Sequence, residues 1–461
     1  MATKNKNPIN SLSNDKTDLI NGDKIEYSHK LRVVELFSGI GSQAKALKNI
    51  NVQFEVVATC EWSVRAMIAY ALIHTKDEFL KGVAECNLSK DQLLESLKDY
   101  NFSMDSKSKM SFKSLNQSNI DVLKCIYSSL QCTKNKVDIQ NLSGYELPTD
   151  IDIMTYSFPC QDLSLAGNMH RVAQGISKSA NTRSGLVWQV ERILHQLDFS
   201  TNTLPKVLVL ENVVALQSRI HKDDFEEWKN VLKNLGYHNK IYVLNSDWFG
   251  AVQKRKRLIM LSFLVGDDVE KCKQIEDYFL KNNLEYEKYR QSQEFNSNIK
   301  SQDIKEILKL DYSNKIYFEE AMQCQPKDTT SRLKIWEENT KIVDINDNSD
   351  NSIKDIQYKY SSNIATITTK QDRNPNAGCI YFDYKDNIKS KFRYLTAREC
   401  FLLMGFDESD YQNIIENNIN IRKNVQLFSQ ISLHFLAGNS IVVEILEQVF
   451  RQVVELYKII F

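Results

Sequence analysis

Short hydrophobic runs alternate with amphipathic stretches in the first part of the chain. Runs typical of strands occupy residues 32–37 and 54–59, and helical patterns follow at 43–47 and 64–73. Alternating strands and helices indicate a parallel sheet with helices on its faces. Residues 75–136 are polar and helical in pattern, and Ser89 with Gln92 predicts a capping box at the start of one helix.

The same alternation returns later and is then interrupted. After about residue 265 the sequence becomes rich in Lys, Asn, Asp, Gln and Tyr, and its periodicity is weak until a strand-like run at 364–368. We therefore predict an α/β domain at 31–267, an irregular insert at 268–385 and a return to the α/β domain at 386–461. The later strands are expected at 151–156, 206–210, 240–244 and 257–262, and the later helices at 185–197, 225–235, 396–404 and 441–459.

Composition restricts the class of protein. The chain has 461 residues, 42% of them hydrophobic, and Lys plus Arg equals Asp plus Glu at 59 each. A zero net charge gives no indication of a nucleic-acid partner, although it can hide a basic cleft. The nine cysteines show no zinc-type spacing, so we expect free thiols, no disulfide framework and no metal site.

Targeting signals are not apparent. The polar residues 1–30 contain no apolar core of a signal peptide, and we expect a disordered tail there. No stretch contains the roughly 20 consecutive apolar residues that a membrane span needs. We expect a cytoplasmic protein without membrane contact, acting as a monomer.

A glycine-rich turn joins the first strand to the first helix. Gly39, Gly41 and Ala44 fit the pattern G-x-G-x-x-A, and Glu61 ends the second strand. Glycines allow a tight turn and a close approach of the backbone to a ligand, while an acid at that distance suits ribose hydroxyls. The turn predicts a nucleoside-containing cofactor but does not separate a nicotinamide from S-adenosylmethionine.

Reactive side chains follow other strands. Cys160 comes after Pro159 at the end of the strand 151–156, and Glu211 follows the strand 206–210. The carboxyl ends of parallel strands share one edge of a sheet. Arg255 and Arg257 lead into another strand, where we expect both to project to the same face. A thiol, an acid and two guanidinium groups suit attack on an anionic, ring-containing substrate.

In this order the motifs resemble those of the DNA (cytosine-5)-methyltransferases, and most closely the CG-methylating enzymes of mollicutes. The resemblance implies a Rossmann-like S-adenosylmethionine-dependent methyltransferase sheet with a smaller, irregular target-recognition domain inserted at 268–385. The matching segments are 35–41, 155–164, 182–186, 211–213, 253–257, 398–406 and 438–442.

The resemblance also implies roles for individual residues. Cys160 matches the nucleophile, Glu211 the residue on the cytosine edge, and Arg255 and Arg257 the basic pair near the base. Twelve further residues match cofactor contacts: Phe37, Gly39, Ile40, Gly41, Glu61, Trp62, Asp138, Ile139, Pro159, Leu186, Asn439 and Ser440.

The family chemistry implies a flipped-out cytosine, a covalent Cys160 adduct and no metal. Double-stranded DNA is the implied partner, and a cognate restriction endonuclease would act without a physical complex. Thr366, Ile367 and Thr368 resemble the start of the family's recognition core, with an ordinary strand as the alternative.

Three other functions stay open at this point. The first is a tRNA (cytosine-5)-methyltransferase, although its relatives usually carry a smaller insert. The second is an NAD-dependent oxidoreductase, which would leave Cys160 and Glu211 without a shared role. The third is a DNA-binding module without activity, which the presence of both residues disfavours.

Overall fold

The computed structural model describes residues 29–160, 163, 176, 178, 183–201, 203–326, 330, 364–372, 377–382 and 392–461. The tail predicted at 1–30 lies, apart from its last two residues, outside this described part.

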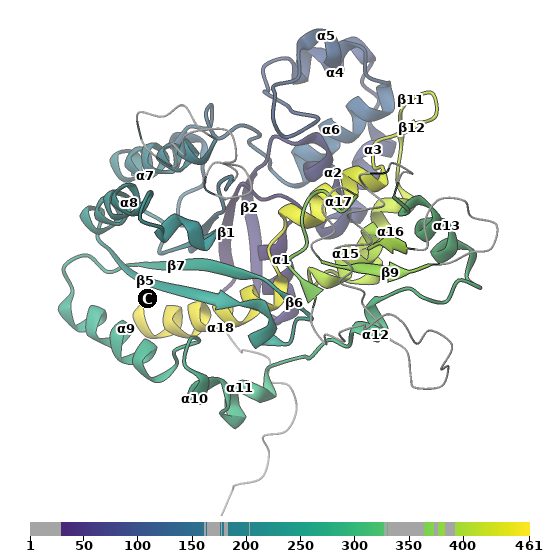
Figure 1. Cartoon of the computed structure of the whole chain (residues 1–461). Coiled ribbons are helices and arrows are strands. Elements are labelled where there is room, and N and C mark those ends of the chain that lie inside the picture. The colour runs from purple at the N-terminus through teal and green to yellow at the C-terminus, as the bar shows by residue number, and fades with distance from the viewer. Residues whose placement is uncertain are drawn as a thin grey trace, which may run out of the picture.

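A six-stranded sheet forms the centre of the molecule (Figure 1). The strand order is β2-β1-β3-β4-β7-β5. The pairs from β2 to β4 are parallel, which confirms the predicted parallel sheet for four strands. The strands are β1 (Leu31–Leu36), β2 (Phe54–Cys60), β3 (Ile153–Tyr156), β4 (Val207–Asn212), β5 (Tyr237–Asn245) and β7 (Lys256–Leu264).

Strand β7 departs from the prediction, because it runs antiparallel to both β4 and β5. Only ten residues separate Asn245 from Lys256. A parallel pair needs a crossover of a dozen or more residues, usually a helix, whereas an antiparallel pair needs only a short connection. The short link therefore accounts for the reversed direction of β7.

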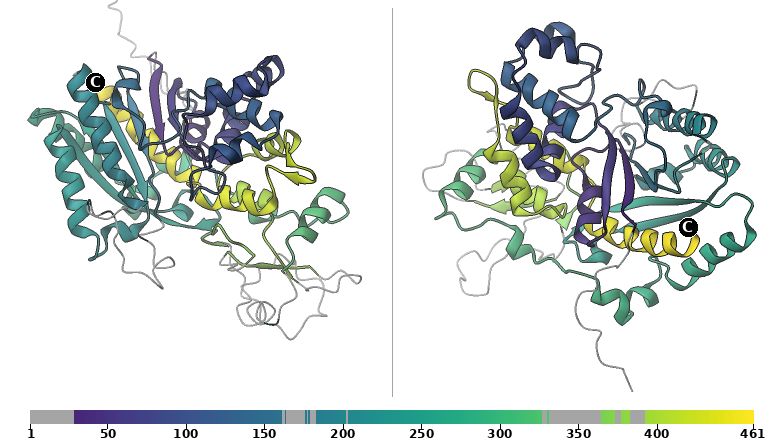
Figure 2. Two further views of the ribbon diagram at one scale, coloured as in Figure 1. Left: turned by 90° about the horizontal axis from the view of Figure 1, so that it is seen from above. Right: turned by 180° about the vertical axis from the view of Figure 1, so that it is seen from behind.

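Helices cover both faces of the sheet (Figures 1 and 2). Val33 and Val34 of β1 belong to different hydrophobic clusters, since successive strand residues point to opposite faces. The cluster of Val33 includes side chains of α1 (Ser42–Asn49), α2 (Val64–His74) and α18 (Val443–Ile460). The cluster of Val34 includes side chains of α7 (Val187–Thr201) and α8 (Lys222–Asn234).

Residues 75–136 form a helical lobe beside this sheet (Figure 1). The Ser89 hydroxyl accepts a hydrogen bond from the Gln92 amide, and the Gln92 side chain accepts one from the Ser89 amide. The predicted capping box is thus confirmed. The lobe contains α3 (Lys76–Glu85), α4 (Lys90–Leu97), α5 (Phe112–Asn116) and α6 (Ile120–Cys132).

The first part of the predicted insert packs against helix α18. Helix α9 (Val269–Lys281) contacts α18, and the side-chain amide of Gln448 donates a hydrogen bond to the Asn298 carbonyl at 3.3 Å. Short helices follow α9 along the chain. They are α10 (Glu287–Arg290), α11 (Gln293–Ser297), α12 (Ile304–Ile307) and α13 (Lys315–Gln323).

The strand predicted at 364–368 is shorter in the structure, where β8 comprises Ile364–Ala365 and pairs with β6 (Gln253–Lys254). Beyond β8 the Ile367 amide bonds the side-chain oxygen of Gln253 at 2.9 Å, so the backbone ladder ends. The remaining elements are β9 (Cys379–Tyr381), β10 (Phe392–Tyr394), α15 (Ala397–Leu403), α16 (Glu408–Glu416), β11 (Asn420–Arg422), β12 (Val425–Gln426) and α17 (Gln430–Asn439).

The helical stretch Gln430–Ile460 has the length and apolar composition of a membrane span, and 83% of its most apolar window is buried within the fold. Burial of this kind is typical of a core helix.

A fully buried ion pair fixes the return from the insert. Arg393 donates two hydrogen bonds of 2.8 Å to the two oxygens of Glu399, and neither side chain is exposed to solvent. Glu399→Gln should lower the free energy of unfolding by about 3 kcal/mol or more, because it leaves a buried guanidinium uncompensated. Urea unfolding followed by tryptophan fluorescence measures this loss.

Glu95→Gln is the control, since Glu95 forms an exposed pair with Lys98 and should hardly matter. Equal unfolding midpoints for both variants would contradict a stabilising role for the buried pair.

Candidate active site

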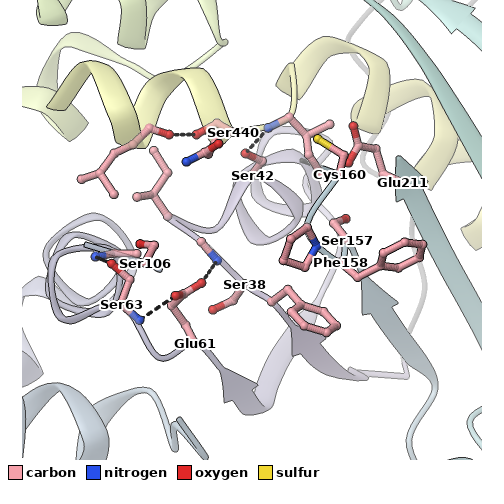
Figure 3. A pocket seen from close by; sticks show the side chains of 18 of the residues that line it. Ser38, Ser42, Glu61, Ser63, Ser106, Ser157, Phe158, Cys160, Glu211 and Ser440 are labelled. Atoms are coloured by element: carbon pink, nitrogen blue, oxygen red, sulfur yellow. Dashed lines mark hydrogen bonds between the residues drawn. The ribbon is translucent and has the colours of Figure 1, made fainter. Parts of the chain in front are cut away.

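A cavity of about 690 Å³ opens where β1, β2, β3 and β4 end (Figure 3). The residues that line it come from the sheet, the lobe, the segment after β8 and the end of α17. It brings together all the site residues predicted from the sequence except Gly41. Those residues are Phe37, Gly39, Ile40, Glu61, Trp62, Asp138, Ile139, Pro159, Cys160, Leu186, Glu211, Arg255, Arg257, Asn439 and Ser440.

The glycine turn and Glu61 are linked directly. Gly39 adopts a left-handed conformation with φ of 54°, and its amide donates to Oε2 of Glu61 at 3.0 Å. The Ser63 amide donates to Oε1 of the same carboxylate at 2.8 Å. Burial raises the pKa of Glu61, while these amides counteract the shift. No atom lies within 4 Å of a Cβ built on Gly39, so the turn leaves open space beside the cavity.

Gly41 has a different reason to be glycine from the one that the sequence indicated. Its φ is 82°, and an added Cβ would lie 2.2 Å from Nε2 of His74 and 2.7 Å from the Tyr70 ring. Nε2 of His74 lies 3.0 Å from the Ile40 carbonyl. Gly41 therefore lets α2 pack beneath the turn, and it does not itself line the cavity.

Glu35 supports the same turn from inside the fold. The Ala44 amide donates to one carboxylate oxygen at 3.0 Å, and the Tyr70 hydroxyl donates to the other. Complete burial raises the pKa of Glu35 from 4.5 to about 7, although both hydrogen bonds oppose the shift. Sequence analysis placed Glu35 in a motif but did not assign it this function.

Asp138 reaches the cavity although the lobe separates it from Trp62 in the sequence. Asn135 closes the lobe at its base: its side chain accepts a hydrogen bond from the Glu61 amide and donates one to the Glu61 carbonyl, both at 2.9 Å. The Asp138 carboxylate accepts a hydrogen bond from the side-chain amide of Asn101 at 2.7 Å and another from the backbone amide of Gln140 at 3.0 Å.

Cys160, Glu211 and Arg257 lie together at one end of the cavity, and Figure 3 shows the first two. Nε of Arg257 lies 2.9 Å from Oε1 of Glu211. Burial raises the pKa of Glu211, and the two arginines counteract it. Burial also raises the pKa of the Cys160 thiol; Arg257 opposes that shift, while Glu211 reinforces it.

Arg255 is placed differently from Arg257. It lies between β6 and β7, is buried, and donates to the carbonyls of Ile367, Gly438 and Ser440 at 2.9, 3.0 and 3.1 Å. Both arginines line the cavity, as expected for side chains that share one face, but their contacts differ. Arg257 is paired with Glu211, whereas Arg255 ties the segment after β8 to the end of α17.

Other residues of the site escaped the sequence analysis. The Asn212 side chain donates to the Phe158 carbonyl at 3.1 Å, and the Ser184 hydroxyl donates to the Pro159 carbonyl at 2.7 Å, so both hold the cysteine loop. Asn212 directly follows Glu211, which is a signal that could have identified it. Further lining residues not predicted are Ser38, Ser42, Gln43, Ser63, Ser106, Lys107, Gln140, Arg183, Thr369, Phe435 and Leu436.

The arrangement is suited to covalent chemistry. Among the described residues, no group of three or more His, Cys, Asp or Glu side chains is placed to hold a metal ion. A thiol beside an acid of raised pKa can add to an electron-poor ring while the acid supplies a hydrogen bond.

Comparisons with known proteins agree with this geometry. Residues 100–455 match the family model of the C-5 cytosine-specific DNA methylases. The orphan methyltransferase M.SssI of Spiroplasma monobiae is 30% identical over 92% of this chain and 97% of its own. The type II methyltransferase M2.ScrFI of Lactococcus lactis subsp. cremoris is 28% identical over 92% of this chain and 98% of its own.

Solved structures support the same fold. The S. pombe Dnmt2 methyltransferase aligns with a TM-score of 0.52 at 19% identity, over 92% of this chain and 99% of its own. An Entamoeba histolytica methyltransferase aligns with a TM-score of 0.51 at 13% identity, over 93% of this chain and 98% of its own.

The buried Glu35 predicts a pH-dependent stability. Its folded-state pKa of about 7 lies above 4.5, so its contribution is complete below about pH 4.5 and is lost as the pH rises through 7. Glu35→Gln removes this titration and keeps an acceptor for Ala44. Relative to the wild type, the free energy of unfolding of the variant should rise by roughly 3 kcal/mol between pH 4.5 and pH 8.

Chemical unfolding of both proteins across this range tests the expectation. Groups common to both proteins cancel in the difference, and Glu95→Gln, at an exposed position, is the control. A difference that does not change with pH would show that Glu35 stays ionised throughout.

Proposed function

The chain belongs to the C-5 cytosine-specific DNA methylases and is a DNA (cytosine-5)-methyltransferase, and from this premise we propose which of its residues perform the reaction. The observation that carries the proposal is the Arg257–Glu211 pair, which lies in one cavity with Cys160 and the glycine turn.

Methyltransferases of this kind use S-adenosylmethionine, and the residues present fit that cofactor. Glu61 offers a half-buried carboxylate for ribose hydroxyls, and its orientation is fixed by two backbone amides. The open space beside Gly39 admits a ligand next to the backbone. Trp62 offers an aromatic face, and Asp138 offers an acceptor for the adenine amino group. The other proposed contacts are Phe37, Ile40, Ile139, Pro159, Leu186, Asn439 and Ser440.

Cys160 is the proposed nucleophile. Its sulfur forms a bond to carbon 6 of a cytosine that has left the stack, since a duplex hides the ring carbons. Glu211, whose raised pKa favours a protonated carboxyl, donates to the ring nitrogen and so stabilises the charge that develops on the ring. Bound S-adenosylmethionine supplies the methyl group that carbon 5 accepts. Loss of the carbon-5 proton and cleavage of the bond between sulfur and carbon 6 then release methylcytosine.

Arg257 lowers the cost of ionising the Cys160 thiol. Its charge is the largest influence that opposes the raised pKa of the Cys160 thiol. Since the thiolate is the attacking species, a nearby cation increases the reactive fraction. The guanidinium of Arg255 donates hydrogen bonds to three backbone carbonyls. We therefore propose that Arg255 positions Ile367 and Ser440 and does not contact the base.

We propose that residues 268–385 read the target sequence in double-stranded DNA. Thr366 and Thr368 line the cavity next to the reactive residues, and threonine can contact base edges. We further propose a monomer in the bacterial cytoplasm. It would serve as the modification enzyme of a restriction-modification system, without a physical complex with its endonuclease. The tRNA alternative is not favoured, because the matching family model describes DNA methylases.

The nucleophile can be tested directly. Cys160→Ala should reduce methyl transfer to duplex DNA by roughly 10³-fold or more and leave cofactor affinity nearly unchanged, since only the covalent step needs sulfur. The assay follows labelled methyl transfer to duplex DNA and to tRNA side by side. With 5-fluorocytosine at the target the wild type should form an adduct that survives denaturation, because fluorine blocks the final elimination.

Cys125→Ala is the control, since this thiol is buried in the lobe, away from the cavity. Absence of an adduct with DNA that the enzyme does methylate would overturn the mechanism. Transfer to tRNA alone would overturn the assignment of the substrate.

Sequence choice should be separable from chemistry. Replacing 303–385 by the matching region of a relative with a measured target should redirect methylation while transfer stays dependent on Cys160. The exchange starts at 303 because α9 and the following turns contact α18. Each bidentate base contact contributes about 1–3 kcal/mol, so losing two or three would erase the original preference.

Sequencing after bisulfite conversion identifies the methylated sites, and CG is the first dinucleotide to inspect. An exchange of the whole 268–385 is the comparison. An active chimera of either kind that methylates the original sites would show that recognition lies elsewhere in the chain.

A further inference from the structure

The helical lobe at 75–136 carries none of the motifs that the proposed function uses. Its loop 101–107 nevertheless reaches the cavity, where Ser106 (Figure 3) and Lys107 are lining residues. Three separate contacts join this loop to residues at the adenosine side of the site. We infer that the loop is a wall of the cofactor site, in which Asn101 positions Asp138 and Ser106 holds Arg183. This inference rests on the proposed function.

The first contact orients Asp138. Nδ2 of Asn101 donates to Oδ2 of Asp138 at 2.7 Å, while the Gln140 amide donates to Oδ1 at 3.0 Å. The carboxylate is thus held from two sides, and each oxygen keeps accepting capacity toward a ligand. Asn101 does not line the cavity, so it acts through Asp138.

The second contact joins the loop to Trp62. The Ser103 amide donates to the Trp62 carbonyl at 2.8 Å, and the Val64 amide donates to the Ser103 carbonyl at 2.9 Å. This short bridge links the loop to the chain on both sides of Ser63, which also lines the cavity. A shift of the loop would therefore displace Trp62, which lines the cavity.

The third contact crosses the cavity. Nη2 of Arg183 donates to the Ser106 carbonyl at 2.7 Å, and Arg183 immediately precedes the turn that carries Leu186. Asp105 keeps the loop rigid, because its carboxylate accepts from the amides of Lys107 and Ser108 at 2.9 Å each. The lobe and the chain after the cysteine loop are thus connected across the site.

Asp138 and Trp62 would recognise adenosine, and Arg183 precedes the turn of Leu186, a further proposed cofactor contact. The described contacts of residues 101–107 include none with Cys160 or Glu211. The ligand class is therefore the adenosine part of the cofactor. Loss of the wall should weaken the binding of S-adenosylmethionine and of its demethylated product alike. Methyl transfer at saturating cofactor should stay close to the wild-type rate.

Calorimetry with the full chain tests this inference with two probes, S-adenosylhomocysteine and adenosine. Asn101→Ala should lower the affinity for both probes by about tenfold, as expected for a lost hydrogen bond to a charged group. The KM for S-adenosylmethionine should rise by a similar factor with kcat unchanged. Asn87→Ala is the matched control, since Asn87 is exposed on the same lobe.

Two further variants separate positioning from a general loss of structure. In an Asp138→Ala background, Asn101→Ala should have little additional effect on affinity, because its partner is gone. Arg183→Ala should accelerate dissociation of S-adenosylhomocysteine several-fold, and it reports on the wall even where an Asn101 variant does not fold.

The outcomes distinguish this inference from the proposed function. A wild-type protein that binds neither probe would overturn the proposed function itself. Wild-type binding with unchanged affinity in Asn101→Ala and an unchanged dissociation rate in Arg183→Ala would overturn the wall alone. Full additivity of the Asn101 and Asp138 substitutions would also overturn the positioning by Asn101.

Discussion

The arrangement of the site depends on the buried guanidinium of Arg255. Burial and the nearby charge of Arg257 lower its pKa to about 9, so holding this cation inside the fold is costly. Its hydrogen bonds to the carbonyls of Ile367, Gly438 and Ser440 offset the cost. They join residues 112, 183 and 185 positions away in the sequence. Gly438 allows the contact, because a Cβ there would lie 2.7 Å from the backbone at Thr368. The segment after β8 and the end of α17 are thereby held together.

Burial also sets the protonation of the reactive residues. It raises the pKa of both Glu211 and the Cys160 thiol, which favours the protonated form of each. Arg257 contacts Glu211 and its charge acts on Cys160, so one cation moderates both effects. The thiol of the free protein is consequently kept mostly protonated.

The sequence was most informative where local pattern determines structure. The strand before Phe37, the glycine turn and the position of Cys160 after β3 followed from periodicity and turn residues. The reasons for Gly41 and Arg255 did not, since they depend on His74 and Ile367, which no local window contains. The direction of β7 was set by a short connection rather than by its own residues. The strand at 364–368 ended early because the Gln253 side chain takes the place of a neighbouring strand.

The lobe shows why a long insertion need not disturb a site built on both sides of it. Its ends are joined at the base, where the Lys136 amide donates to the Thr59 carbonyl at 2.8 Å and Asn135 bonds both backbone groups of Glu61. The entropy of closing a loop grows only with the logarithm of its length, so a longer lobe adds little cost once these bonds exist. The lobe also has its own buried side chains, including Leu93, Leu97 and Leu123. Because its base is fixed beside Glu61 and Asp138, the loop 101–107 that it projects inward reaches the same cavity.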